Sequence, residues 1–185
     1  MIGVGGHTFD ETLIGDGVII DIGCRDFTFS MSEHFAKNKV YCIDPDKEVF
    51  NLCPSGVESL NYAISDIEGE ERYYKNGEST CLERFYKGHE HLMIGCHTMT
   101  MGQLYKITGF NVDLLKLDCE GAEYIILGEN FLPVPKQITV EWHAHMFPQI
   151  HMDNIAKCLK NLEEHYNIAY QCESGMDTLF IKKNL

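Results

Sequence analysis

Residues 17–31, GVIIDIGCRDFTFSM, decide the fold of this chain. The β-branched run from Val18 to Ile22 predicts a strand that is buried on both faces of a parallel sheet. The strand ends in Asp-Ile-Gly and leads through polar residues into an expected helix over roughly Ser30 to Lys37. Such a junction builds the floor of many nucleotide sites, where glycine lets a ligand approach the backbone. The stretch therefore predicts an α/β fold that binds a ligand beyond this strand.

The totals indicate a single globular domain over residues 1–185. Hydrophobic residues make up 44% of the chain and charged residues 23%, which is ordinary for a globular protein. The formal charge is −13, from 28 acidic and 15 basic residues. This excess repels a phosphate backbone, so we expect no nucleic-acid partner. Neutral sugars suit such a charge better than anionic polymers do.

The cysteines and the first residues bear on the compartment. None of the eight cysteines forms a C-x-x-C pair, which favours reduced thiols over a disulfide framework. The N-terminal MIGVGGHTFDETL lacks the features of a signal peptide, and no later run is as long as a membrane span. We therefore expect a cytoplasmic protein with no membrane partner. The GVGGH segment lacks the Lys-Ser/Thr ending of a phosphate loop and is expected to be a flexible lead-in.

The rest of the chain alternates expected strands and helices. Strands are expected over residues 39–43, 59–64, 70–75, 91–99, 112–117 and 137–142, with a loop over 76–81, and helices over 46–52, 103–108, 121–128 and 149–165. The last segment, 167–183, has two strand-like runs around SGMD and predicts an antiparallel hairpin. The sequence thus predicts a Rossmann-like doubly wound sheet, mostly parallel with an antiparallel C-terminal hairpin. That is the usual layout of class I methyltransferases.

The strand endings supply candidate site residues, because ligands bind beyond the carboxyl ends of the strands in an open α/β sheet. These endings are Asp21-Ile22-Gly23, Asp44, Ile64-Ser65-Asp66, Asp118-Cys119-Glu120 and Glu141-Trp142-His143. Two of them allow two interpretations. Asp44 could accept hydrogen bonds from both hydroxyls of an adenosine ribose, or it could cap the helix that Pro45 begins. Asp66 could reach the adenine amino group, or it could belong to a plain turn.

The run LKLDCEGAE at residues 115–123 is the most distinctive of the chain. Together with VIIDIGCRDFTFS, YCIDPD, NYAISDIEGE and ITVEWH, in the same order along nearly the whole chain, it resembles the FkbM family of methyltransferases. The central motif of that family reads Lys-Ile-Asp-Val-Glu-Gly-Ala-Glu. The matching positions here are Lys116, Asp118, Glu120, Gly121, Ala122 and Glu123.

The resemblance implies that the chain binds S-adenosylmethionine and passes its methyl group to a hydroxyl on a sugar or another small natural product. The implied cofactor-binding residues are Asp21, Gly23, Cys24, Arg25, Asp44, Pro45, Ile64, Ser65, Asp66 and Asp118. The implied partner is a small-molecule or glycan acceptor, whose identity the family does not fix. Residues 67–98, residues 143–151 or a second subunit of a homo-oligomer are left to build the acceptor site.

The loop after the first strand departs from the family pattern. That pattern is typically Asp-x-Gly-x-Asn-x-Gly-x-x-Ser, whereas this chain has Arg25 at the Asn position and Phe27 at the second Gly. If that position needs positive φ, Phe27 costs of order 1 to 3 kcal/mol in strain or blocks the pocket. Alternatively, Phe27 turns inward as packing.

Methyl transfer to a hydroxyl needs a base, with the acceptor in line with the S–CH₃ bond. The catalytic candidates are Asp118, Glu120, Glu141, His143 and His145. The EWHAH run places Glu141 and His143 on one face of a strand, and His143 is the expected base. A divalent metal on Asp118, Glu141 and His143 is chemically reasonable. The spacing does not support it, so no metal ligand is predicted.

Two other functions remain open. A catalytically silent protein that binds a partner through the cofactor fold would explain Phe27. A nicotinamide-dependent reductase is disfavoured, because the chain lacks G-x-G-x-x-G and ends in a hairpin.

Overall fold

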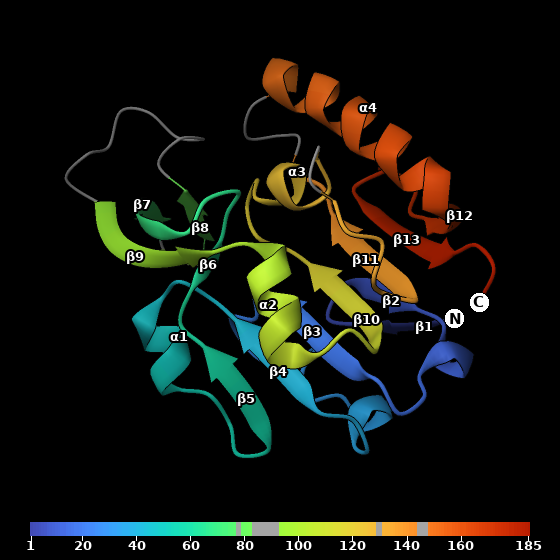
Figure 1. The fold of residues 1–185 in the computed structure, drawn as a ribbon, viewed down its shortest axis with the longest axis horizontal. Helices are drawn as coiled ribbons and strands as arrows, with labels where there is room; N and C mark the ends of the chain where they lie inside the picture. Colours follow the sequence, from blue (N-terminus) through green and yellow to red (C-terminus); the bar gives the residue numbers. More distant parts are fainter. Residues whose placement is uncertain (77–78, 83–92, 129–130, 144–147) are drawn as a thin grey trace.

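The structure is a computed structural model that describes residues 1–76, 79–82, 93–128, 131–143 and 148–185. Its centre is a seven-stranded sheet with the order β12-β13-β11-β10-β3-β4-β5 (Figure 1). The strands are β3 (Val18–Ile22), β4 (Val40–Ile43), β5 (Val57–Leu60), β10 (Val112–Leu117), β11 (Gln137–Glu141), β12 (Tyr166–Gln171) and β13 (Asp177–Lys182). Neighbours from β5 to β11 run parallel, and β13 runs antiparallel to both β11 and β12. The chain is thus a mixed α/β protein with a mostly parallel central sheet.

The two central strands, β3 and β10, are apolar on both faces, which is why the sheet buries them. Ile19 and Ile20 of β3 and Leu114 and Leu115 of β10 are fully buried. The pairing register sets Asp21 beside Lys116 at the carboxyl ends of these strands. The charged residues of the expected site therefore start from neighbouring positions in the sheet.

Helices cover one face of the sheet. Helices α2 (Met101–Thr108), α3 (Glu123–Ile126) and α4 (Pro148–His165) contribute residues to the same buried cluster as the inward side chains of β3, β10 and β11. Leu104 of α2 and Leu162 of α4 are fully buried in that cluster. The expected helices over 103–108, 121–128 and 149–165 are therefore present, although α3 is shorter than its prediction.

The opposite face is covered by aromatic side chains instead of a long helix. The helix expected over Ser30 to Lys37 is wrong, because the segment forms only the short 3-10 helix η2 (Glu33–Phe35). Phe29 and Phe35 pack there with Phe9, with ring centroids 5.1 to 6.1 Å apart. Because both rings are buried against the sheet, the backbone from Ser30 to Lys37 stays close to the sheet. The segment therefore does not form a regular α-helix.

The N-terminal segment is a β-hairpin, so the expected flexible lead-in is wrong. Strands β1 (Ile2–Val4) and β2 (His7–Phe9) pair antiparallel around Gly5 and Gly6, which both have positive φ. Two such residues form the turn that suits the twist of a hairpin. After β2, the amide N–H of Asp10 donates to Gln137 Oε1 (2.8 Å), and Gln137 Nε2 donates to the Asp10 carbonyl (3.0 Å). These bonds fasten the hairpin to β11.

A second, four-stranded sheet with the order β6-β9-β7-β8 stands beside the first (Figure 1). Its strands are β6 (Ala63–Ile64), β9 (Met93–Met99), β7 (Gly69–Asn76) and β8 (Ser79–Leu82). The single strand expected over 59–64 is therefore split between two sheets, with a turn in which the Tyr62 N–H donates to the Leu60 carbonyl. The loop expected over 76–81 is wrong where it overlaps β7 and β8, and residues 77–78 lie outside the described ranges.

Two further short helices complete the described chain, α1 (Lys47–Asn51) and the 3-10 helix η1 (Glu11–Leu13). All eight cysteines lie in described ranges and are free thiols. Among the described residues, no helix combines the length and the apolar character that crossing a bilayer needs.

Candidate functional site

The carboxyl ends of β3, β10 and β11 bring an ionic cluster together around Lys116. The Lys116 ammonium lies 3.0 Å from Asp21 Oδ1 and 3.3 Å from Asp118 Oδ2, and it donates to the Gly23 carbonyl (2.6 Å). Burial alone would lower the pKa of Lys116, but the two carboxylates outweigh burial and raise it. Lys116 is therefore a fixed cation that joins the ends of two strands.

Gly23 is required by the close approach of these two strand ends. Its φ is +80°, and a Cβ there would lie 1.7 Å from the Asp118 carbonyl oxygen. The Gly23 N–H donates to the Ile43 carbonyl at the end of β4 (2.9 Å). The glycine thus lets three strand ends meet, which is a structural reason for its presence beside any role toward a ligand.

Phe27 shows both features considered for the loop, a strained backbone with positive φ and a side chain that packs inward. It has positive φ (59°), the strained backbone that a glycine would adopt freely. Its side chain is buried with Cys24, Cys42 and Val49, so the ring packs inward. Arg25, at the other departure from the family loop, is partly buried.

Asp44 does not cap the helix that follows it. The N-cap of α1 is Asp46, whose side chain accepts from the Glu48 N–H. The Asp44 carboxylate accepts from the Asp46 N–H (2.8 Å), and burial raises its pKa to about 6. The ribose interpretation of Asp44 stays a prediction.

The third strand ending lies apart from the ionic cluster. Ile64 and Ser65 are buried at the end of β6, and the Ser65 hydroxyl donates to Asp66 Oδ1 (3.2 Å). Asp66 is exposed, in a bend that precedes β7. Ser65 and Asp66 line a hollow of about 480 Å³ with residues of α2 and α3, which does not include Gly23 or Asp44.

Two adjoining hollows lie beyond the ends of β3 and β4. The inner one has a volume of only about 30 Å³; it is lined by Ile22, Gly23, Ile43, Pro45, Tyr62, Ala63, Ile64, Tyr73, Cys81, Cys119 and Ala122. The outer one, of about 880 Å³, shares Pro45 and Tyr73 with it and is otherwise more polar, with Asn61, Glu71 and Arg72 in its lining. Phe27 lines neither hollow. The outer volume is within the range of small-molecule sites.

His143 stands among carboxylates just after β11. Its Nδ1 lies 3.1 Å from Glu123 Oε1, and its Nε2 lies 3.5 Å from Asp118 Oδ1 and 3.6 Å from Glu120 Oε2. Burial alone would lower the pKa of His143, but the hydrogen bond and charge of Glu123, helped by Glu120 and Asp118, raise it to about 9. The imidazole is therefore protonated at neutral pH, and it must lose this proton before it can act as a base.

Glu123 holds the turn after β10 in place. The fully buried Glu123 carboxylate accepts from the Cys119 N–H (2.7 Å) and the Gly121 N–H (2.8 Å). Glu120 has positive φ (52°), an uncommon conformation for a residue with a Cβ. The acidic turn is thus rigidly shaped, and Glu120 projects toward His143 from it.

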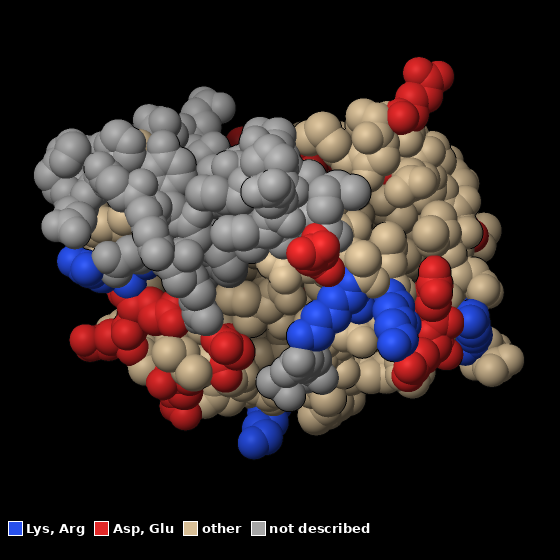
Figure 2. Space-filling model, turned by 90° about the horizontal axis from the view of Figure 1, so that it is seen from above, with Lys and Arg blue, Asp and Glu red and all other residues tan. Residues whose placement is uncertain are grey.

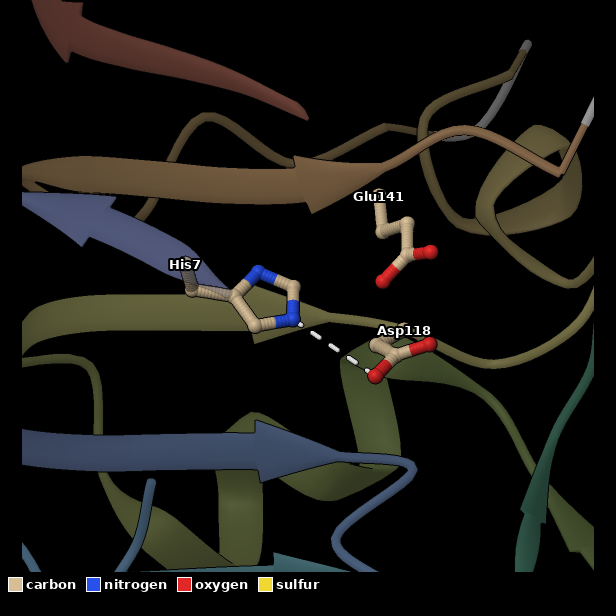
Figure 3. A group of neighbouring side chains, drawn as sticks. All are labelled: His7, Asp118 and Glu141. Atoms are coloured by element: carbon tan, nitrogen blue, oxygen red, sulfur yellow. Dashed lines mark ion pairs between the residues drawn. The ribbon is translucent and has the colours of Figure 1, made fainter. Parts of the chain in front are cut away.

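His7 belongs to the site, although the sequence did not indicate it. His7 of β2, Asp118 and Glu141 come from three elements and point toward one another (Figure 3). His7 Nε2 lies 3.5 Å from Asp118 Oδ2. The Asp118 pKa would be raised by burial, yet the close contact with His7 and the charges of Lys116 and His143 lower it. The Glu141 pKa is raised, first by burial and then by Asp118.

The structure thus brings together Asp21, Gly23, Asp118, Glu120, Glu141 and His143 from the expected site. His145 lies outside the described residues. The pair Gly5-Gly6, flanked by alternating residues, is a hairpin signal that could have located His7 on a strand.

The profile described as Methyltransferase FkbM domain matches residues 14–168. The chain belongs to the FkbM methyltransferase family. No curated protein and no solved structure matches it. The family match spans β3 to the first half of β12 and includes every site residue expected from the sequence, but it does not include the β1–β2 hairpin. His7 therefore lies outside the region that the family model matches.

Proposed function

We propose that this FkbM protein is an S-adenosylmethionine-dependent methyltransferase that methylates a hydroxyl oxygen of a small molecule or a glycan. The observation that supports this most is the convergence of Asp21, Lys116 and Asp118 over the Gly23 backbone. It puts the matched residues of the family motif at the carboxyl ends of neighbouring parallel strands. That edge of an open α/β sheet is where ligands bind.

The residues beside the two hollows suit an adenosyl ligand. Asp44 is a buried carboxylate next to Pro45, which lines both hollows, and a carboxylate at the end of the second strand can accept from ribose hydroxyls. The outer hollow has room for a nucleoside, whereas the inner one of about 30 Å³ admits no more than a water-sized group. In this proposal Pro45 borders the outer hollow, Asp44 beside it holds the ribose, and Gly23 lines only the inner hollow.

The acidic cluster suits the methyl-transfer end. When bound, S-adenosylmethionine supplies an activated methyl group on a cationic sulfur. Asp118, Glu120 and Glu141 surround that end with negative charge, and His143 links them through its Nε2. These groups share protons, so we propose that the cluster accepts the hydroxyl proton as a unit. Positioning of the two reactants supplies the rest of the acceleration.

Isothermal titration with S-adenosylmethionine and S-adenosylhomocysteine tests cofactor binding, with Asp44→Ala as the variant. We expect one site per chain and at least a tenfold weaker affinity in Asp44→Ala, since a ribose contact of about 1.4 kcal/mol or more is lost. Glu58→Ala, an exposed carboxylate on β5, is the matched control. Transfer of a labelled methyl group to a panel of neutral polyols and glycosides then tests the reaction.

A catalytically silent binding protein is the second candidate, and the strained, inward-packed Phe27 together with the small inner hollow favours it. Cofactor binding without transfer to any acceptor would support this candidate. Absence of binding by either cofactor form would contradict the proposed enzyme.

A further inference from the structure

The geometry points to a divalent metal site made by His7, Asp118 and Glu141, and we propose that it binds a transition-metal ion of the Mn²⁺ class. The three side chains come from β2, the turn after β10 and the end of β11, and they converge on one point (Figure 3). One ligand atom from each can be chosen so that all three lie within 4.8 Å of one another. Ligands held about 2.1 Å from one ion lie roughly 3 to 4 Å apart, so a closure of about 1 Å completes the site.

The Nε2 of His7, which lies 3.5 Å from Asp118 Oδ2 but makes no hydrogen bond within the described structure, is the observation that calls for a cation. His7 is 1% exposed, and its Nε2 accepts or donates no hydrogen bond within the described structure. The other ring nitrogen, Nδ1, lies 3.5 Å from the Thr139 hydroxyl. If Nδ1 carries the proton, the Nε2 lone pair faces two carboxylates, which is unfavourable until a cation lies between them. A histidine that binds a metal with one nitrogen is commonly oriented by such a partner at the other.

The charge around the site also favours a cation. Five carboxylates, those of Asp21, Asp118, Glu120, Glu123 and Glu141, surround Lys116 and His143. Asp21 lies closest to the Lys116 ammonium, at 3.0 Å, and neutralises much of its charge. The remaining excess of negative charge lies on the side of Asp118 and Glu141, where a divalent ion would reduce the repulsion.

The donor set selects the kind of ion. One imidazole nitrogen and two carboxylate oxygens suit Mn²⁺ and its transition-metal neighbours, whereas Mg²⁺ prefers oxygen ligands alone and keeps several waters. Three protein ligands leave further positions open on such an ion. Glu141 has a side chain that is 32% exposed, so these positions can be reached from solvent.

The open positions give the site a use that rests on the proposed methyl transfer. An acceptor that offers two neighbouring oxygens, such as a vicinal diol, could occupy two of them and be held by the ion. Coordination lowers the pKa of a bound hydroxyl. Glu120 would remain to take the proton, since it is not among the three ligands. The inferred acceptor class is therefore a chelating diol.

Titration of the full chain with Mn²⁺, followed by electron paramagnetic resonance, tests the site without any methyl donor. We expect one ion per chain and nitrogen modulation in the electron spin echo. His7→Gln and Glu141→Gln should each weaken the Mn²⁺ affinity at least tenfold, and His7→Gln should abolish the nitrogen modulation. Mg²⁺ should compete at least tenfold more weakly than Mn²⁺. His97→Gln is the matched control, because His97 faces the single carboxylate Glu70 on an exposed surface and should leave the affinity unchanged.

Circular dichroism and thermal unfolding establish that each variant is folded. The buried His7→Gln variant could fail to fold. In that case the site is tested by the partly exposed Glu141→Gln variant and by the nitrogen modulation of the unaltered chain. The site is contradicted if the unaltered chain binds no Mn²⁺, if its spectrum lacks nitrogen, or if folded Glu141→Gln binds as tightly as His97→Gln. Titration with S-adenosylhomocysteine in metal-free buffer separates the two proposals. Cofactor binding without Mn²⁺ binding contradicts only the metal site. Mn²⁺ binding without cofactor binding contradicts only the proposed enzyme.

Discussion

The Asp44 carboxylate is buried, so its ionisation should lower the free energy of unfolding. Burial raises the pKa of Asp44 from its ordinary value near 4 to about 6. The folded state then holds this proton more tightly than the unfolded state, so the favourable contribution present at low pH is lost as the pH rises from about 4 to about 6. Asp44→Asn keeps an oxygen for the Asp46 N–H but carries no charge. We expect this variant to be more stable than the unaltered chain by about 1 to 3 kcal/mol at pH 8, with no gain at pH 4.

Urea unfolding at the two pH values measures this difference. The same variant should bind S-adenosylmethionine more weakly, because the ribose contact is proposed to use the charge. A variant that loses stability at pH 8 would show that Asp44 is structural rather than held for a ligand.

Gly23 permits a second prediction at the scale of one residue. Gly23→Ala would put a Cβ 1.7 Å from the Asp118 carbonyl oxygen, and backbone atoms cannot yield as a flexible side chain does. We expect a loss of more than about 3 kcal/mol in the free energy of unfolding, or no folding at all. Gly56→Ala is the matched control, since Gly56 also has positive φ (94°) but has no atom within 4 Å of the added Cβ. It should cost only about 1 kcal/mol. Equal losses in the two variants would mean that the strand ends do not approach as closely as the structure shows.

At the scale of elements, the β1–β2 hairpin depends on Gln137. The fully buried Gln137 side chain exchanges two hydrogen bonds with the Asp10 backbone, across the gap between the hairpin and β11. We expect Gln137→Leu to lower the free energy of unfolding by about 1 to 3 kcal/mol, because the part-buried Asp10 N–H loses its partner and the Asp10 carbonyl keeps only the bond from the Leu13 N–H. Since His7 lies in this hairpin, the Mn²⁺ affinity should fall as well, although no ligand is altered. Gln171→Leu, an exposed position on β12 whose amide makes one long bond of 3.4 Å to Thr178, should change neither quantity. Unchanged hydrogen exchange in the hairpin amides of Gln137→Leu would contradict this account.

Strands were predictable where their signal is local. The bounds Val18–Ile22 and Val112–Leu117 are those that the apolar runs indicated, because a strand buried on both faces needs mostly apolar residues, here interrupted only by charged residues that pair with one another or with neighbouring groups. The segment from Ser30 to Lys37 also looked like a helix. Its outcome depends on Phe29 and Phe35 packing on Phe9, which is distant in the sequence. Tertiary packing overrode the local pattern there.

The site residues also differ in whether a local sequence signal could predict them. The strand-end carboxylates Asp118, Glu120 and Glu141 were predictable, because parallel strands bring their carboxyl ends to one edge. His7 was not, since it lies next to Thr139 in space but 132 positions away in the sequence. Likewise, the protonation of His143 depends on Glu123, whose buried position no spacing rule could give.

At the scale of the whole molecule, the charge of −13 is spread over a surface where both signs occur. On the described part of the face drawn in Figure 2, Lys and Arg side chains stand as separate groups beside Asp and Glu side chains. The strongest local excess of negative charge among the described ion pairs lies at the strand ends.

This arrangement predicts how salt should affect the two forms of the proposed cofactor. S-adenosylmethionine carries a sulfonium charge that S-adenosylhomocysteine lacks, and the two are otherwise nearly the same shape. Both the strand-end carboxylates and the net charge attract the sulfonium, and added salt screens this attraction. Between 20 and 300 mM KCl we expect the affinity for S-adenosylmethionine to fall by about three- to tenfold, and that for S-adenosylhomocysteine by less than about twofold. Titration calorimetry on the same preparation measures both. Parallel salt dependences would place the sulfur away from Asp118 and Glu141, and they would remove the electrostatic basis for assigning the methyl-transfer end to this cluster.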